Sequence, residues 1–437
     1  MSQAACPHGD AHIAQRVCVH LFKGEAQSYS HRFTGQGIAY DLLCPACAER
    51  SALADDETTE PPGDLLAATC AACFETVAAG ATWSTGERAV LSAPAIAERP
   101  TRLAFQHEMV RVSSALGSPL RDLVPLPGSS ASRWVAVTTR GRLAVIDLGD
   151  KSATHVAELD GAGVDPEHDL EIAASPDGKL AAVVESRGSS GVVVDLETGD
   201  ITMLLDRGEP ARGARYPVAF AGIGDRVVLV AASAWNRLDA FDPRSGDPLT
   251  SRPAGEAQEH QLEYVSSGLS VSPDGVWLVD NGFTAEGAGL VSAFALAPWL
   301  DGNPWEPEDG PSKRYLCQRW DFWDGPVAWL DDGTLAVFGY GPSRASMIPA
   351  VILFDLDSGE PVRWFAGPQG PLVHDGYLFS MDQSGVSVWD SATGERLLHD
   401  AGFQPLRYHV GARQFLTTNP DADLFVVSRL AGSPDPP

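Results

Sequence analysis

The sequence predicts an all-β chain, in which a small cysteine-rich module precedes a larger body built from repeated four-stranded sheets. Two observations carry this prediction. Six of the seven cysteines fall within the first 73 residues, and two turn phrases between short strands rich in β-branched residues recur after residue 100. The chain has 437 residues, more than one hydrophobic core usually serves, so a repeat architecture with many small cores is expected.

The cysteines near the amino end form four short pairs with histidine or with one another. Two thiolates separated by two residues point at one ion from a tight turn, and two such knuckles complete the tetrahedral shell that Zn²⁺ prefers. Cys-x-His offers the same arrangement with one nitrogen donor. We therefore expect one or two zinc ions, held by ligands drawn from Cys6, His8, Cys18, His20, Cys44, Cys47, Cys70 and Cys73.

Spacing alone does not choose how the four pairs combine. Three ways of joining them exist, and a single all-cysteine site made of the two C-x-x-C pairs would leave the Cys-x-His pairs incidental. Disulfides, which a cytosolic chain disfavours, and a C-x-x-C redox pair, which lacks its strand and helix context, are the other interpretations. Four protein ligands leave no open position, so the zinc is expected to be structural. Residues 6 to about 77 resemble zinc-ribbon and treble-clef modules.

We place the zinc-binding module at residues 1–90, a linker at 91–100 and the larger body at 101–437. The linker contains Pro94 and Pro100 and has no sustained periodicity, which is typical of a connection between domains.

Beyond the linker, two hairpin turns return in a fixed order between short apolar strands. In such turns Asp or Ser side chains satisfy nearby backbone amides, and glycine takes the positive φ that the turn demands. The first turn is Ser175-Pro-Asp-Gly178, Ser272-Pro-Asp-Gly275 and, more loosely, Leu330-Asp-Asp-Gly333. The second is Asp195-Leu-Glu-Thr-Gly-Asp200, Asp242-Pro-Arg-Ser-Gly-Asp247, Asp355-Leu-Asp-Ser-Gly-Glu360 and Asp390-Ser-Ala-Thr-Gly-Glu395.

The spacing of these turns favours a single β-propeller of about seven four-stranded blades. The second turn steps 47 residues from Asp195 to Asp242 and 35 from Asp355 to Asp390. The 337 residues after position 100, divided by seven, give about 48, close to the roughly 40 to 50 residues of a propeller blade. Ring closure would pair the segment 102–112 with the C-terminal segment 423–428.

Val388-Trp389-Asp390 ends a third strand at the place where the WD40 family carries its namesake dipeptide. The larger body therefore resembles the WD40-like propellers, in a degenerate form. Only this blade carries the dipeptide and no Gly-His partner is present, so the family's Asp-His network is not carried over to the other blades. The resemblance implies a rigid surface that presents binding sites.

The net charge of −27 argues against a polyanionic partner. Residues 1–100 hold 6 basic and 12 acidic side chains, which leaves 25 and 46 for the remainder. Nucleic-acid affinity rests largely on Lys and Arg replacing phosphate counterions, so neither DNA, RNA nor an anionic membrane surface is expected as a partner. No apolar run approaches the ~20 residues of a membrane span, and no export signal is recognised. A cytoplasmic location is expected.

No nucleophile elbow, phosphate loop, G-x-G-x-x-G or H-E-x-x-H motif occurs in the sequence. Two His-x-x-Glu strings, His168 to Glu171 and His260 to Glu263, are weak metal or catalytic candidates, as are His374-Asp375 and His409. The leading hypothesis is a non-enzymatic protein-interaction or scaffold protein. The alternative is a propeller enzyme of the lactonase, lyase or hydrolase type, with a metal-assisted site in the central channel.

The segment from Pro298 to Pro326 is rich in aromatic residues among acidic ones. Exposed rings make good anchors for a protein partner, because a ring buries much area at little rotamer cost. Packing between neighbouring blades is the other interpretation, and Cys317 is expected to be a small core residue. The candidate partner-binding residues are Trp299, Trp305, Trp320 and Trp323.

Overall fold

The structure is a computed structural model that describes most of residues 95–433 and six stretches before them. These stretches are residues 15–33, 40–47, 66–69, 73–74, 76–77 and 82–83. Within 95–433 it leaves out residues 113–115, 129, 210–212, 251, 253–259, 261–263, 285–286, 342–343, 345–346 and 420–422. The chain divides into a smaller unit, made of residues 1–96 with 339–353 and 361–367, and a larger unit with the rest. No helix in the described ranges has the length and apolar character to cross a membrane.

The smaller unit contains a mixed five-stranded sheet in the order β4-β1-β3-β2-β5. Val17, Leu42 and Phe74 are almost fully buried against it. The short helix α1 directly follows β1, so the chain turns sharply at the end of that strand. The elements are β1 (Gln15–Cys18), α1 (Val19–Phe22), β2 (Ser28–Phe33), β3 (Tyr40–Leu43), β4 (Leu66–Thr69) and β5 (Thr82–Trp83).

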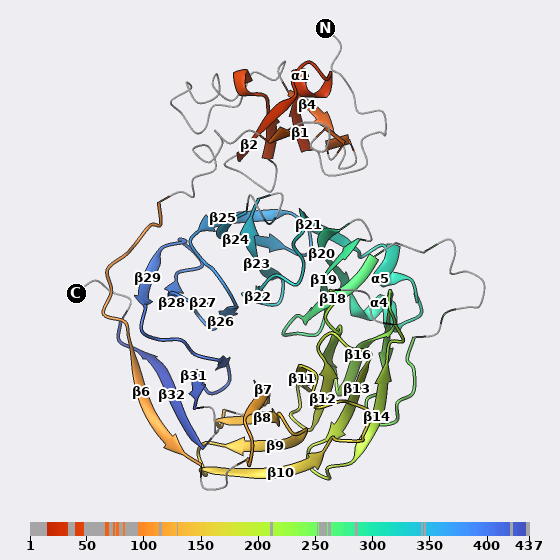
Figure 1. Ribbon diagram of the computed structural model, residues 1–437, viewed down its shortest axis with the longest axis vertical. Helices are drawn as coiled ribbons and strands as arrows, with labels where there is room; N and C mark the ends of the chain where they lie inside the picture. Colours follow the sequence, from red (N-terminus) through yellow and green to blue (C-terminus); the bar gives the residue numbers. More distant parts are fainter. Residues whose placement is uncertain are drawn as a thin grey trace. The chain divides into compact units, whose positions relative to one another are not determined.

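Beyond residue 100 the described chain forms seven antiparallel sheets that follow one another around a ring, a propeller-like arrangement (Figure 1). Within a sheet, consecutive strands are neighbours, and the first strand lies innermost. The first four sheets are β7 (Leu120–Pro125), β8 (Arg133–Thr138), β9 (Arg142–Asp147) and β10 (Ser152–Glu158); β11 (Leu170–Ala174), β12 (Leu180–Glu185), β13 (Ser190–Asp195) and β14 (Ile201–Asp206); β15 (Val218–Ile223), β16 (Arg226–Ala234) and β17 (Arg237–Phe241); β18 (Tyr264–Val271), β19 (Trp277–Thr284), β20 (Ala288–Ala295) and β21 (Arg314–Trp320). Helices α4 (Leu296–Leu300) and α5 (Glu306–Asp309) lie between β20 and β21.

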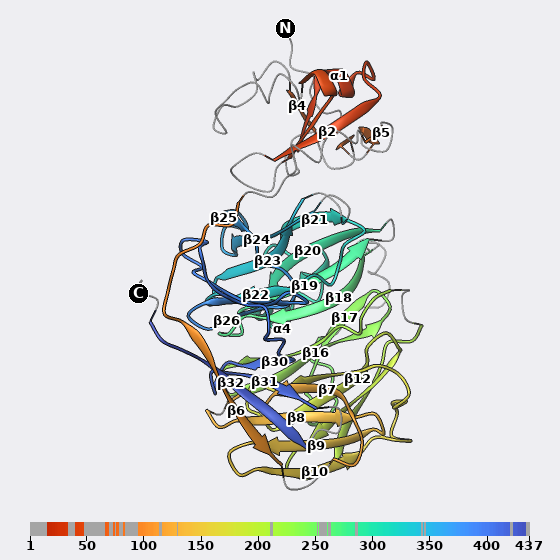
Figure 2. The ribbon, with the colours of Figure 1, turned by 60° about the vertical axis from the view of Figure 1, so that its left-hand side comes forward.

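The last sheet contains β6, the first strand after residue 100, beside three strands from the C-terminal end. Strand β6 (Ala104–Arg111) pairs antiparallel with β32 over eight residues, from Arg111 opposite Leu424 to Ala104 opposite Ala431. Figure 2 shows the two strands side by side, and the predicted pairing of the two chain ends is confirmed. The remaining strands are β22 (Val327–Trp329), β23 (Thr334–Tyr340), β24 (Ile348–Asp355) and β25 (Pro361–Ala366); β26 (Leu372–His374), β27 (Leu378–Asp382), β28 (Gly385–Trp389) and β29 (Arg396–Asp400); β30 (Arg407–His409), β31 (Gln414–Thr418) and β32 (Leu424–Ala431).

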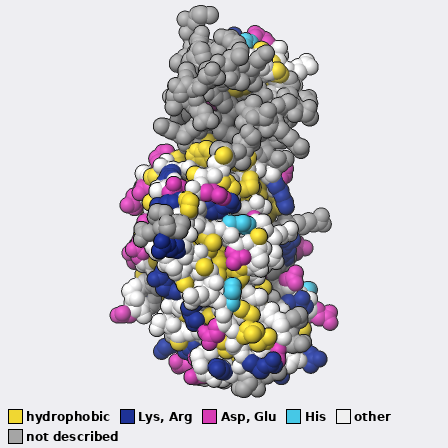
Figure 3. All heavy atoms as spheres, turned by 90° about the vertical axis from the view of Figure 1, so that its left-hand side faces the viewer, with side chains coloured by type: hydrophobic (Ala, Val, Ile, Leu, Met, Phe, Trp, Pro, Cys, Tyr) yellow, Lys and Arg dark blue, Asp and Glu magenta, His cyan; other side chains and the backbone are white. Residues whose placement is uncertain are grey.

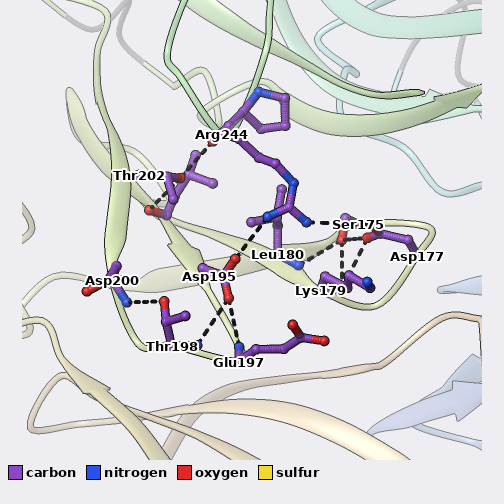
Figure 4. A network of polar contacts seen from close by, with 12 residues as sticks. Ser175, Asp177, Lys179, Leu180, Asp195, Glu197, Thr198, Asp200, Thr202 and Arg244 are labelled. Atoms are coloured by element: carbon purple, nitrogen blue, oxygen red, sulfur yellow. Dashed lines mark hydrogen bonds and ion pairs between the residues drawn. The ribbon is translucent and has the colours of Figure 1, made fainter. Parts of the chain in front are cut away.

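The repeated phrases form the predicted hairpin turns, as the second sheet shows (Figure 4). The hydroxyl of Ser175 accepts from the amide of Leu180 (2.9 Å), and Asp195 Oδ1 accepts from the amides of Glu197 (2.9 Å) and Thr198 (3.1 Å). Gly199 closes the second turn at φ +80°, a conformation that favours glycine. The same Asp-to-amide bonds recur at Asp242, Asp355 and Asp390, so these side chains replace missing ladder bonds at each turn.

The third sheet has three strands in the described residues, where four were expected. After β17 the chain returns alongside this strand, where Pro248 bridges Phe241 and the Leu249 amide donates to the Ala240 carbonyl (2.7 Å). Side chains add further bonds to the same edge. The hydroxyl of Thr250 accepts from the amide of Ala240 (3.0 Å), and the guanidinium of Arg252 donates to the carbonyl of Leu238 (3.3 Å).

Residues 97–100, the last part of the predicted linker, are bonded to the sheet β26-β27-β28-β29. The backbone amide of Arg99 donates to the Arg396 carbonyl (3.0 Å), and the Arg396 amide donates to the Ala97 carbonyl (2.8 Å). The guanidinium of Arg99 also contacts Asp390 Oδ2 at 2.5 Å. Backbone bonds to this sheet therefore begin before position 101.

We predict that Asp390→Asn lowers the free energy of unfolding by about 1 kcal/mol near neutral pH, the scale of a partly exposed ion pair. Burial of Asp390 opposes ionisation, but bonds from Arg99 and the Thr393 and Ala392 amides outweigh it and hold the pKa below 3.8. The stabilisation is therefore present above this value and is lost as the pH falls through the folded pKa. Denaturant unfolding of both proteins between pH 7 and 3 measures the difference.

A matched control is Glu197→Gln, which changes an exposed acid in the corresponding turn of the second sheet. It should leave the stability unchanged within about 0.5 kcal/mol. A difference between wild type and Asp390→Asn that stays constant down to pH 3 would contradict the assignment.

Candidate metal centre

Four predicted ligands lie at the ends of two neighbouring strands of the smaller unit. Cys18 ends β1 and His20 lies in helix α1, whereas Cys44 and Cys47 follow β3. Strands β1 and β3 are parallel, with Arg16 opposite Asp41. Because parallel strands end on the same side of a sheet, the two donor pairs converge.

The four donor atoms are close enough together to share one ion. The Sγ atoms of Cys18, Cys44 and Cys47 and a ring nitrogen of His20 all lie within 4.8 Å of one another. His20 Nδ1 lies 3.6 Å from Cys44 Sγ and 3.3 Å from Cys47 Sγ. A tetrahedral zinc with ordinary bond lengths would separate nitrogen and sulfur by about 3.6 Å. This group could hold a metal ion.

The three thiols are buried and are not joined in disulfides. Burial raises the pKa of Cys18, and burial with the neighbouring Cys44 raises the pKa of Cys47 to about 12. Thiolates crowded into an apolar site repel one another, and a bound cation is what compensates such a cluster. The amide of Cys44 also donates to Cys18 Sγ (3.3 Å), a bond that favours the thiolate.

Among the residues that the structure describes, Cys18 and His20 come together with Cys44 and Cys47. The alternative site made of the two C-x-x-C pairs includes Cys70, which lies outside the described residues. Cys73 is described and half-buried but is not among these four donors. Cys6, His8 and Cys70 lie outside the described residues, so their role stays a prediction. With four protein donors the site has the composition of a structural centre rather than a catalytic one.

Sequence reasoning did not single out Arg16 and Asp41, which lie beside the donors. Asp41 is fully buried, and Arg16 Nε donates to Asp41 Oδ1 at 2.8 Å. The sequence does carry a signal for this ion pair: a basic residue precedes one donor pair and an acidic residue precedes the other, each within a short strand. Buried charges are found almost only when they are paired.

The expectation of an exposed aromatic surface does not hold for two of the four tryptophans. Trp299 is 1% and Trp305 is 7% exposed. Trp299 packs edge-on against Phe294 with ring centroids 5.4 Å apart, and the Arg252 guanidinium covers Trp305 at 4.6 Å. These rings anchor the α4–α5 connection to its sheet. Trp320 and Trp323 are partly exposed, and a partner-binding role for them stays a prediction.

The candidate histidines take part in local contacts. His168 Nδ1 lies 3.3 Å from Glu185, whereas Glu171 accepts from Arg215 at 2.7 Å. His260 stacks on Trp305 at 4.5 Å. The other two are His374, whose pKa burial lowers, and His409, which packs edge-on against Trp134. Among the residues that the structure describes, the group at Cys18 is the one set suited to a metal.

We predict that Trp299→Ala lowers the free energy of unfolding by about 3–5 kcal/mol, because it removes a large buried side chain. Trp235→Ala, which changes a tryptophan that is 46% exposed, should change it by no more than about 0.5 kcal/mol. Denaturant unfolding measures both. Equal effects of the two substitutions would contradict the assignment of Trp299 to the core.

Comparison of the sequence with models of protein families found no match, and comparison with curated proteins found none either. The four-donor geometry and the ring of sheets are therefore the observations from which a function has to be argued.

Proposed function

We propose that the chain is a non-enzymatic protein-interaction protein. In this proposal a degenerate WD40-like propeller, closed and seven-bladed, presents a rigid binding surface. A structural zinc site folds the smaller module, which offers a second docking surface. A cytoplasmic location, where thiols stay reduced, suits the zinc site.

Two features support a closed ring of seven blades. Seven sheets follow residue 100, six of them four-stranded, and the last combines β6 with three C-terminal strands. Polar contacts also link the inner strands of neighbouring sheets. Arg407 of β30 pairs with Asp122 of β7 (2.8 Å), and Asp122 accepts from the Ile172 amide of β11 (2.9 Å). Arg215, just before β15, pairs with Glu171 of β11 (2.7 Å).

The observation that carries the interaction proposal is that the two faces of the ring differ. In a four-stranded antiparallel sheet the last strand ends on the face where the first began. The connections between sheets therefore lie on this face, which we call the entry face. The repeated short turns join first to second and third to fourth strands, so they lie on the opposite, hairpin face. In the fourth sheet the longer α4–α5 connection joins the third strand to the fourth on that face. Long, non-repetitive connections on a rigid scaffold are where binding residues are usually found.

The surface chemistry of the ring fits a protein partner better than a polyanion. On the face of the molecule in Figure 3, Lys and Arg side chains are interspersed with Asp and Glu. At the entry face, the partly exposed guanidinium groups of Arg215 and Arg407 are held by carboxylates. Because these ion pairs fix the side chains before binding, less entropy is lost when a partner docks.

We predict that the entry face carries the partner contacts. Asp169→Lys changes an entry-face acid whose side chain is 89% exposed, and Trp235→Ala removes an exposed ring between β16 and β17. Each should lower the recovery of specific partners from extracts of the source cells about tenfold or more, since hot-spot losses of ~2 kcal/mol are common. Quantitative crosslinking and affinity purification measure the recovery.

Glu197→Lys is the matched control, because it reverses an exposed acid of the same sheet on the hairpin face. It should leave the recovered set unchanged. If the hairpin-face variant loses partners while both entry-face variants keep them, the assignment of the faces is wrong. Turnover of a metabolite by the purified chain, without any stable partner, would refute the interaction role.

We also predict one to two zinc ions per full-length chain and none in a shortened chain starting at Ala95. The combined substitution Cys18→Ser with Cys47→Ser should remove one equivalent. If Cys6, His8, Cys70 and Cys73 form a second four-ligand site, the other equivalent should remain. Elemental analysis after dialysis against a weak chelator measures these contents. Equal zinc in the wild type and the double variant would contradict the four-donor site.

A further inference from the structure

The two donor pairs of the metal centre leave adjacent parallel strands at the same end. The register places Arg16 opposite Asp41 and Val17 opposite Leu42, and Cys18 and Cys44 follow within two residues. The distance between the donor pairs therefore depends on how β1 and β3 are aligned. A slip by one residue would move one pair along the strand by roughly 3.3 Å, whereas metal–ligand bonds tolerate about 0.2 Å.

Apolar packing alone specifies this alignment weakly. Strands β1 and β3 have four residues each, so their ladder is short. Val17 and Leu42 are fully buried, but burial of apolar surface is not directional.

The ion pair between Arg16 and Asp41 is directional. Arg16 Nε donates to Asp41 Oδ1 at 2.8 Å, and Arg16 Nη2 donates to Asp41 Oδ2 at 3.2 Å. This is the two-pronged geometry in which a planar guanidinium matches a carboxylate. The Asp41 side chain is 0% exposed and that of Arg16 is 25% exposed. A shift of one strand would separate these two charges and break both bonds of the pair.

We propose that the Arg16–Asp41 pair positions the metal donors, because it locks the register of β1 against β3. Neither side chain is among the four candidate donors; both act through the strands that carry Cys18 and Cys44. The amide of Cys44, which donates to Cys18 Sγ at 3.3 Å, is held in place by the same register. This inference rests on the metal centre proposed above.

The test compares the full-length wild type with Asp41→Asn and Arg16→Lys. Asparagine keeps the shape of the carboxylate without its negative charge. Lysine keeps the positive charge of arginine but not the planar group that donates both bonds. Each variant should raise the apparent zinc Kd about 10–100-fold, the usual effect of removing an outer-shell partner. Competition with a chromophoric chelator measures the Kd. The visible spectrum of the Co²⁺-substituted protein should also change, since it reports the ligand geometry.

Two controls separate positioning from general destabilisation. Glu158→Gln breaks an ion pair with Arg142 (3.0 Å) in the larger unit and should leave the zinc Kd within about twofold of the wild type. Combining Arg16→Lys with Asp41→Asn should weaken zinc binding no more than the worse single variant, because one shared interaction is lost once. Arg16→Lys keeps a cation beside Asp41, so its zinc Kd can still be compared with that of the wild type if Asp41→Asn fails to fold.

The outcomes distinguish the two proposals. A wild-type protein that retains no zinc refutes the metal centre and this inference with it. If the wild type holds zinc but both single variants bind it within about twofold of the wild type, only the positioning role is refuted. Additive effects in the double variant would also refute it, because additivity means that the two side chains act independently.

Discussion

The antiparallel pairing of β6 with β32 is the constraint on which the ring of sheets depends. Arg111 and Asp423, which pair at one end of it, are 312 residues apart in sequence. Loop-closure entropy grows only slowly with length, so eight paired residues and the burial of Phe425 and Val427 offset it. Without β6 the last sheet would have three strands and an exposed edge, which invites pairing with other chains.

Polar side chains at the inner strands also link neighbouring sheets at three places: β30 with β7, β7 with β11, and β11 with Arg215 before β15. Asp122 accepts from both Arg407 and the Ile172 amide, and Glu171 accepts from Arg215 and Ser186. Asp122 thus links β7 to both of its neighbouring sheets, and Glu171 links β11 to the residue that precedes β15.

The sequence predicted the features that local chemistry determines. An aspartate that accepts amides two and three residues ahead, with a glycine at positive φ, forms its turn wherever the chain places it. The first sheet shows where such a local phrase fails to identify a turn. Its turn after Asp147 uses the same amide bonds, from Gly149 and Asp150, but Lys151 takes the positive φ of 54°. The glycine of this turn is at 149 and not at the positive-φ position 151, so the turn does not match the repeated phrase.

The other differences depend on distant residues. In the described residues the third sheet has three strands, and the bonds of Thr250 and Arg252 to its edge depend on where β17 lies. Trp299 is buried because it packs in one apolar cluster with Val228 and Leu238 of the third sheet. Neither outcome follows from the pattern of apolar residues along the chain.

The donor residues of the metal centre were predictable because spacing between two cysteines is local chemistry. Their combination was not, because it depends on which strands are neighbours. The order β4-β1-β3-β2-β5 places the second and third donor pairs side by side. The apolar cluster around Val17 and Leu42 is small, so such a module needs coordination energy to fold. The donors end the very strands that must align, so metal and sheet favour one register. In the positioning role proposed above, the Arg16–Asp41 pair favours that same register.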